Sequence, residues 1–241
     1  MSAQRKSYPD ADAAAQACGA HILALLETAV SGDSDATLAV SGGTTPKPMF
    51  DYMARAGFNW SHVHIFWVDE RAVPPNHEQS NYRLVEDCLI KPGRIPHRNV
   101  HRVYGELPPA QAAKRYQADL IDFFEILEGD LPHFDVIHLG MGADAHTASL
   151  FPGEPLVEDR ESLAAAVFVE KIPQWRITLL PGVLLAAHHI AALVAGQDKG
   201  PALQHVFQGG YSPREYPAQI IAHHARRATW FLDAAAAQAL E

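Results

Sequence analysis

Residues 134–153 read FDVIHLGMGADAHTASLFPG, and this stretch indicates the fold class of the chain more clearly than any other. Its first six residues form a short apolar run that stops at glycines, which is typical of a buried strand followed by a turn. Two earlier apolar runs also end in polar loops: residues 37–40 precede SGGTTP, and residues 63–68 precede DER. Helical patterns follow both loops. Such alternation predicts a mostly parallel sheet with helices on both faces.

Hydrophobic periodicity predicts the remaining elements of this α/β fold. Apolar residues at three- and four-residue spacing indicate helices, at residues 10–30, 47–55, 81–89 and 109–127. Further apolar runs indicate strands, at residues 165–169, 176–180, 190–195, 219–222 and 229–232. The chain before the first predicted strand reads as one helix. Since no linker or internal repeat interrupts the sequence, residues 1–241 are expected to form a single α/β domain.

The composition excludes several kinds of partner. The chain of 241 residues is 48% hydrophobic and 20% charged, as is usual for globular proteins. Its 28 Asp and Glu outnumber 19 Lys and Arg, and the resulting formal net charge of -9 argues against nucleic acid as a partner. No apolar stretch is long enough for a membrane span or a secretion signal. We therefore expect a cytoplasmic protein that contacts no membrane, and a monomer, because nothing in the sequence demands a second subunit.

The sequence SGGTT, which follows the first predicted strand, has the composition of an anion-binding loop. Gly42 and Gly43 let backbone N–H groups approach a ligand closely, and the hydroxyl groups of Ser41, Thr44 and Thr45 can donate hydrogen bonds. A helix that begins directly after the loop would direct its positive end at an anion. An ordinary capped turn with no ligand remains the alternative.

Asp144 and His146 form a candidate acid–base pair after the strand at residues 134–139. A neutral imidazole can take a proton from water near pH 7, and a carboxylate two residues away can orient it. The chain has 14 histidines, however, and most of them must be surface or structural residues. The same loop also fits the dinucleotide pattern G-x-G-x-x-A, with Glu158 or Asp159 as the ribose ligand.

Three cationic side chains follow or begin predicted strands and could bind a phosphate or a carboxylate, namely Arg71, Arg176 and Lys199. Each could equally be a solvated surface charge. Two adjacent histidine pairs, at 188–189 and 223–224, could suggest a metal site. The side chains of neighbouring residues point apart, however, and no carboxylate or cysteine stands at ligand spacing from either pair. The two cysteines form no CxxC motif. We therefore expect no metal ion.

Taken together, the segments LAVSGGTTPKPMF, IFWVDERAVPPNHEQSNYRL, FDVIHLGMGADAHTASLFPG, WRITLLP and GQDKGPAL resemble the 6-phosphogluconolactonase family of the pentose phosphate pathway. The resemblance implies a Rossmann-like α/β fold and the hydrolysis of 6-phospho-D-glucono-1,5-lactone to 6-phospho-D-gluconate without a metal or an organic cofactor, which is the work of a carboxylic ester hydrolase. It implies that His146 is a general base that activates water, with Asp144 in support.

By the same resemblance, the substrate-binding residues are those of the SGGTT loop together with Asp69, Arg71, Arg176 and Lys199. The loop, Arg176 and Lys199 would hold the phosphate group. One position departs from the family, which usually has glycine where this chain has Ala145. An alanine resists a positive φ, so it could displace the loop that carries His146.

Other functions remain possible within and outside this family. A related amino-sugar-phosphate isomerase or deaminase would carry a glutamate five residues after the histidine, where this chain has Phe151. A sugar-phosphate sensor of a transcription regulator would need a DNA-binding unit, and the single helix predicted at the N-terminus does not supply one. A dehydrogenase is the third alternative.

Overall fold

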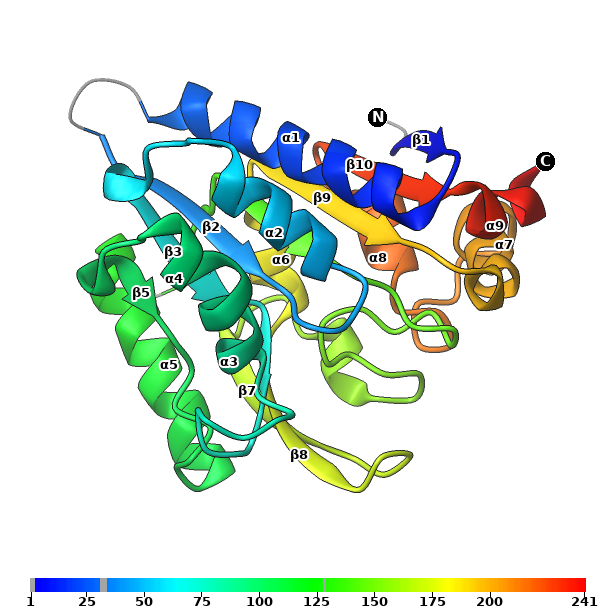
Figure 1. Ribbon diagram of the computed structural model, residues 1–241. Helices are drawn as coiled ribbons and strands as arrows, with labels where there is room; N and C mark the ends of the chain where they lie inside the picture. The colour runs from blue at the N-terminus through cyan, green and yellow to red at the C-terminus, as the bar shows by residue number, and fades with distance from the viewer. Residues whose placement is uncertain (1–2, 31–33, 128) are drawn as a thin grey trace.

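The computed structural model describes residues 3–30, 34–127 and 129–241 (Figure 1). Seven strands form one sheet in which every neighbouring pair is parallel. In spatial order they are β1 (Gln4–Tyr8), β10 (Ala228–Asp233), β9 (His189–Val194), β6 (Val136–Leu139), β2 (Ala36–Val40), β3 (Val63–Trp67) and β5 (Val100–His101). The central strands β2 and β6 are buried along their whole length.

Helices lie on both faces of this sheet. The helices are α1 (Ala11–Ala29), α2 (Lys47–Arg55), α3 (Asn81–Val85), α4 (Lys91–Gly93), α5 (Pro109–Phe124), α6 (Pro181–Ala186), α7 (Gly200–Gln208), α8 (Gln219–His224) and α9 (Ala234–Ala237). A π-helical turn (Glu86–Ile90) joins α3 to α4. Short 3₁₀ turns are formed by Trp60–His62, His97–Asn99, Pro155–Glu158, Gln197–Lys199 and Gln238–Leu240. Helices α1 and α2 pack against each other on one face, and α6 and α8 lie together on the other (Figure 1). The predicted α/β architecture is thus confirmed.

A second, antiparallel sheet projects from the main sheet. It consists of β4 (Asp69–Arg71), β8 (Gln174–Leu179) and β7 (Ala164–Val169), in the order β4-β8-β7. The hairpin of β7 and β8 extends away from the body of the molecule in Figure 1. Because Arg71 pairs directly with Arg176 in this sheet, two arginines that are 105 positions apart in the sequence become neighbours.

Two expectations about individual strands are corrected by the structure. Residues 219–222, predicted as a strand, belong to helix α8. This prediction is wrong because a short, buried apolar run has the same sequence pattern in a strand and in a helix. The N-terminal region contains strand β1 in addition to its helix, and the sequence QRKSY gave no apolar signal because β1 is an exposed edge strand. The predicted strands at 165–169 and 176–180 exist, but in the second sheet.

Three further features bear on the sequence-based predictions. The helix expected at 109–127 ends at Phe124, where Glu125 adopts the left-handed conformation with φ of 50°. The organisation of residues 1–241 as one domain stays a prediction. Among the described residues, no helix combines the length and hydropathy that crossing a bilayer requires.

The order of the strands opens a crevice between β2 and β6. From β2 the chain proceeds outward through β3 to β5, and it then returns to the other side of β2 to form β6 and β9. The connections that follow β2 and β6 therefore leave the sheet in opposite directions. In open α/β sheets such a reversal of strand order places a binding crevice beyond the carboxyl ends of the two strands.

Hydrogen bonds between Thr37 and Asp135 join β2 and β6 at their amino ends, which is the side of the sheet away from the crevice. The Asp135 carboxylate accepts hydrogen bonds from the backbone N–H and the hydroxyl of Thr37, at 2.8 and 2.9 Å, and the Thr37 hydroxyl accepts one from the Asp135 N–H at 2.9 Å. This reciprocal pair satisfies two backbone groups that the sheet leaves free. It also fixes the register of the two strands that border the crevice.

We expect Thr37→Val to lower the free energy of unfolding by ~1–3 kcal/mol, because it keeps the side-chain shape but leaves the Asp135 N–H without its acceptor. Urea unfolding followed by circular dichroism measures the change. The matched control is Thr229→Val, since Thr229 lies buried in β10 and its hydroxyl forms no hydrogen bond with the described residues. Equal effects of the two substitutions would contradict a role of the Thr37 link.

Candidate active site

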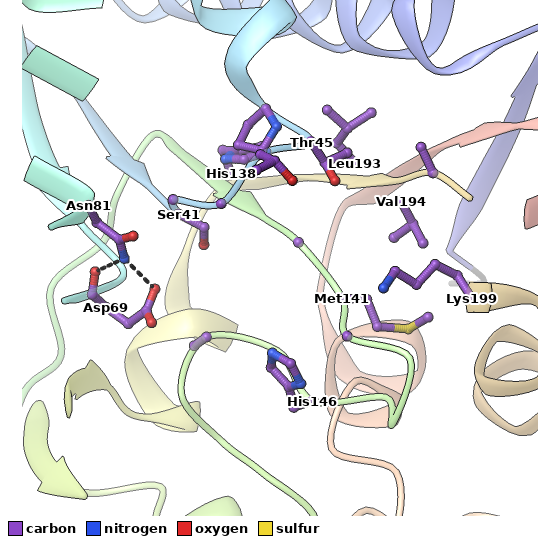
Figure 2. Close-up of a pocket in the computed structure, with 18 of the residues that line it drawn as sticks. Ser41, Thr45, Asp69, Asn81, His138, Met141, His146, Leu193, Val194 and Lys199 are labelled. Atoms are coloured by element: carbon purple, nitrogen blue, oxygen red, sulfur yellow. Dashed lines mark hydrogen bonds between the residues drawn. The ribbon is translucent and has the colours of Figure 1, made fainter. Parts of the chain in front are cut away.

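A pocket lies at the carboxyl ends of β2 and β6, where the strand order reverses (Figure 2). Residues from six separate parts of the chain line it. Those named from the sequence are Ser41, Gly42, Gly43, Thr44, Thr45, Asp69, Arg71, His146, Arg176 and Lys199. Asp144 lies behind His146 and reaches the pocket only through that ring. The structure thus brings together residues that are up to 158 positions apart.

The SGGTT loop connects the end of β2 to the beginning of α2 and forms one wall of the pocket. Gly43 has a φ of 102°, which favours glycine, and a Cβ at Gly42 would overlap the Asn81 side chain. No side chain caps the first turn of α2, and the buried Ser41 hydroxyl has no partner among the described residues. The loop therefore presents hydrogen-bond donors that a bound anion could use.

The buried carboxylate of Glu70 connects two parts of the quoted segment IFWVDERAVPPNHEQSNYRL, namely residues 69–71 (DER) and residues 80–81 (SN). It accepts hydrogen bonds from the N–H groups of Arg71, Asn81 and Tyr82, each at 2.7 Å, and from the Ser80 hydroxyl at 3.0 Å. Burial raises the pKa of Glu70, and these four donors oppose that shift. Glu70 thereby holds the beginning of α3 against β4.

Asp69 and two arginines form the wall next to β4 and β8. One Asp69 carboxylate oxygen accepts a hydrogen bond from the Ser149 hydroxyl at 2.7 Å and lies 3.7 Å from a terminal nitrogen of Arg176. The Asn81 amide donates to the Asp69 carbonyl at 2.8 Å (Figure 2). Arg71 donates to the Gln79 carbonyl at 2.6 Å.

Arg71 and Arg176 place two positive charges close together in a largely buried wall of the pocket, where Asp69 is a nearby carboxylate. Burial lowers the pKa of Arg176, Asp69 opposes that shift, and the nearby Arg71 adds to it. The Nε atoms of both arginines are buried and have no partner among the described residues. A negatively charged ligand would relieve the repulsion and satisfy these donors. Lys199 adds a further cation, although its ammonium lies 2.8 Å from the Asp198 carboxylate in this structure.

His146 and Asp144 form a hydrogen-bonded pair on the opposite side of the pocket. Nδ1 of the imidazole donates to the Asp144 carboxylate over 2.5 Å, which leaves Nε2 available to a molecule in the pocket. The Lys171 ammonium binds the other carboxylate oxygen at 2.8 Å. The hydrogen bond to His146 and the one from Lys171 hold the pKa of Asp144 well below its usual range, so the carboxylate stays ionised at neutral pH.

Packing fixes the orientation of the His146 ring. Phe151 stacks on it with ring centroids 4.2 Å apart and an interplanar angle of 21°. A Cβ at Gly142 would overlap the imidazole, so only glycine fits there. The Gly142 N–H also donates to the His146 carbonyl at 2.9 Å and closes the loop. The ring therefore has a single orientation, with one nitrogen directed to Asp144.

Ala145 adopts the strained conformation that its position demands. It is fully buried and has a φ of 61°, a region that disfavours residues with a Cβ. Its N–H donates to the Gly142 carbonyl at 3.0 Å, and its carbonyl accepts from the Ala218 N–H at 2.9 Å. These contacts hold the loop closed, and the bond between Asp144 and His146 forms in spite of the alanine.

Several residues at the site were not identified from the sequence. Asn81 and His138 line the pocket, Lys171 binds Asp144 from the tip of the second sheet, and Ser149 supports Asp69. Asn81 and Ser149 belong to quoted motifs, SN and HTASLFPG, so a signal existed for them. Lys171 carries none, because only the folded chain places it here. His138 lies in the quoted segment FDVIHLGMGADAHTASLFPG, but the apolar pattern predicts it as part of the strand and not as a pocket residue.

The alternative sites considered from the sequence gain no support. A dinucleotide-binding turn requires a helix directly after the strand, but residues 140–150 after β6 form turns and an isolated bridge between Thr147 and Leu150. Within the part of the chain that the structure describes, no three His, Cys, Asp or Glu side chains are grouped to hold a metal ion. The histidine pairs therefore form no such group.

Comparison with known proteins gives consistent results. The family model described as glucosamine-6-phosphate isomerases/6-phosphogluconolactonase matches residues 9–230. The chain is 38% identical to a 6-phosphogluconolactonase of Nostoc sp., over 89% of each chain, and 36% identical to that of Synechocystis sp., over 88% of each chain. Its fold is similar to the solved 6-phosphogluconolactonase of Trypanosoma brucei, with a TM-score of 0.89 and 22% identity over 99% of each chain.

The role of Glu70 can be tested by Glu70→Gln. An amide has one acceptor oxygen and would turn its NH₂ group toward N–H donors, so we expect the free energy of unfolding to fall by ~1–3 kcal/mol. Urea unfolding checks this. Glu78→Gln is the control, because Glu78 is an exposed carboxylate in the loop between β4 and α3. A loss of stability no larger than that of the control would show that Glu70 does not hold α3.

Proposed function

The chain belongs to the glucosamine-6-phosphate isomerase/6-phosphogluconolactonase family, and we propose that it is a 6-phosphogluconolactonase in which His146 is the general base. The reaction is the hydrolysis of 6-phosphogluconolactone to 6-phosphogluconate in the pentose phosphate pathway. One observation carries the assignment of the base. The His146 imidazole is held by an ionised carboxylate at Nδ1 and leaves Nε2 free toward a pocket whose other walls are cationic.

The chemistry of lactone hydrolysis matches these groups. Water adds to the carbonyl carbon of the lactone while Nε2 of His146 takes a proton from it. The bond between that carbon and the ring oxygen then breaks, and the imidazolium returns the proton to the departing oxygen. Arginine and backbone N–H donors in the pocket stabilise the negative charge that develops on the carbonyl oxygen between these steps.

Asp144 supports the base without taking the proton itself. Its carboxylate fixes the imidazole tautomer that carries hydrogen on Nδ1, and it stabilises the imidazolium formed during the reaction. The hydrogen bonds from His146 and Lys171 hold the pKa of Asp144 below its ordinary value, so the carboxylate stays charged, and this support persists, throughout the neutral pH range.

The phosphate group is proposed to bind to the SGGTT loop, Arg176 and Lys199, which supply N–H, hydroxyl and cationic donors for it. Asp69 and Arg71 complete the lining of the substrate pocket. Binding energy from the remote phosphate then orients the reacting carbonyl.

Within the family, Phe151 favours hydrolysis over isomerisation. Moving a proton between carbons requires additional acid–base groups, and the family's deaminases have a glutamate at this position. Here the position is filled by an aromatic ring that stacks on His146 and exchanges no proton. A location in the cytoplasm and a monomeric state are part of this proposal.

We expect His146→Ala to lower kcat by ~10²–10⁴-fold with little change in KM, because the base acts in the transition state and contributes little to ground-state binding. The measurement is the rate of 6-phosphogluconate formation from freshly generated lactone, corrected for spontaneous hydrolysis and made with EDTA present. His188→Ala is the control, since His188 is remote from the pocket. Turnover by His146→Ala near that of the control would remove His146 from the mechanism.

Lys199→Ala tests the phosphate site. We expect KM for the phosphorylated lactone to rise by about tenfold or more, while hydrolysis of unphosphorylated gluconolactone is unchanged, because only the first substrate needs the cation. Steady-state kinetics with both lactones measure the difference. Similar losses with both would contradict a phosphate contact by Lys199.

A further inference from the structure

His138 is a buried polar residue that the reaction described above does not use. It lies on β6, two residues before the loop that carries His146, and its side chain is 1% exposed. The other members of the strand, Val136, Ile137 and Leu139, are apolar. The imidazole therefore occupies a place in the sheet where an apolar side chain would be expected.

The His138 ring has no hydrogen-bond partner in the described structure. Both Nδ1 and Nε2 are buried and unpaired, and its aromatic neighbour, Phe50 of α2, contacts it edge to face with centroids 5.9 Å apart. Burial lowers the pKa of His138 to about 3, so the ring is neutral at pH 7 and offers one N–H and one lone pair. Buried polar groups without partners destabilise a fold and are rare in native proteins.

The position of the ring shows which ligand could satisfy it. His138 lines the pocket, and Figure 2 shows it on the side formed by Ser41 and Thr45, across from His146. Its contact with Phe50 places it on the face of the sheet that α2 covers, beneath the SGGTT loop. Ser41 on that loop also has an unpaired hydroxyl. Unsatisfied donors thus gather where the first turn of α2 begins.

We propose that His138 is a specificity-determining residue that donates a ring N–H to the phosphate group of the bound substrate. A rotation of the ring at the base of the pocket brings the N–H to the ligand, and the anion provides the partner that the empty site lacks. The residue then contributes to binding of phosphorylated lactones and not to the attack of water. This inference rests on the proposed function, since it assumes a phosphorylated sugar in the pocket.

The experiment compares binding of two probes, 6-phosphogluconate and gluconate, to the wild type, His138→Leu and His138→Gln by isothermal titration calorimetry. We expect His138→Leu to weaken 6-phosphogluconate binding by about tenfold or more and to leave gluconate binding unchanged. His138→Gln retains a side-chain N–H and should restore most of the affinity. Equal binding of 6-phosphogluconate by the wild type and His138→Leu would overturn the proposal, as would equal losses for both probes.

A matched control and a second measurement guard against misfolding. His101→Leu removes a partly buried histidine of β5, which lies outside the pocket, and should change neither affinity. In the wild-type protein labelled with ¹⁵N-histidine, the His138 ring signals should shift on addition of 6-phosphogluconate and stay fixed with gluconate. Unshifted signals under saturating 6-phosphogluconate would refute the contact even if His138→Leu does not fold.

The same measurements distinguish a failure of the proposed function from a failure of the proposed role of His138. A wild-type protein that neither hydrolyses the lactone nor binds 6-phosphogluconate would overturn the function and this inference together. A wild-type protein that does both, with an unaffected His138→Leu, would overturn only the role of His138.

Discussion

The site depends on one feature of the sheet, namely the reversal of strand order between β2 and β6. These two strands are hydrogen-bonded neighbours, yet their following loops leave in opposite directions. The SGGTT loop and the loop that carries His146 therefore face each other across a gap that no element of the sheet fills. A proton acceptor and an anion-binding wall can occupy the two sides of that gap without contacting each other.

The second sheet supplies what the parallel sheet alone does not. Pairing of β4 with β8 brings Arg71 beside Arg176, and the buried carboxylates of Asp69 and Glu70 hold this strand against α3 and residue 149. Two guanidinium groups in a largely buried place repel each other unless anions are near. The Asp69 carboxylate offsets part of that repulsion, and the remaining positive charge faces the pocket.

The pocket also concentrates features that would destabilise an ordinary core. Ala145 has a positive φ, and Ser41, His138, Arg71 and Arg176 each have a buried polar atom without a partner among the described residues. Outside the pocket, the buried side-chain polar atoms without a partner among the described residues are the indole Nε1 atoms of Trp60, Trp67 and Trp230, whereas Thr37 is paired with Asp135. Strain and unsatisfied donors at one place are typical of functional sites, where a ligand completes the hydrogen bonding.

The sequence alone determined the parallel α/β sheet, the loops after residues 40, 68 and 139, and the pairing of Asp144 with His146. These features depend on hydrophobic period, turn residues and spacing within a few positions, which are local properties of the chain. The residues also offered Arg71, Arg176 and Lys199 as candidate cations, and the resemblance assigned them to substrate binding.

Only the tertiary structure decided which distant residues meet. The antiparallel sheet, the helical state of residues 219–222, the contact of Lys171 with Asp144 and the place of His138 in the pocket depend on pairing between segments far apart in the chain. A short apolar run forms a strand or a helix according to what it packs against, and a lone lysine or histidine carries no local signal of its partner. The free energy that fixes these features comes from long-range burial and hydrogen bonding, so it becomes visible only in the folded chain.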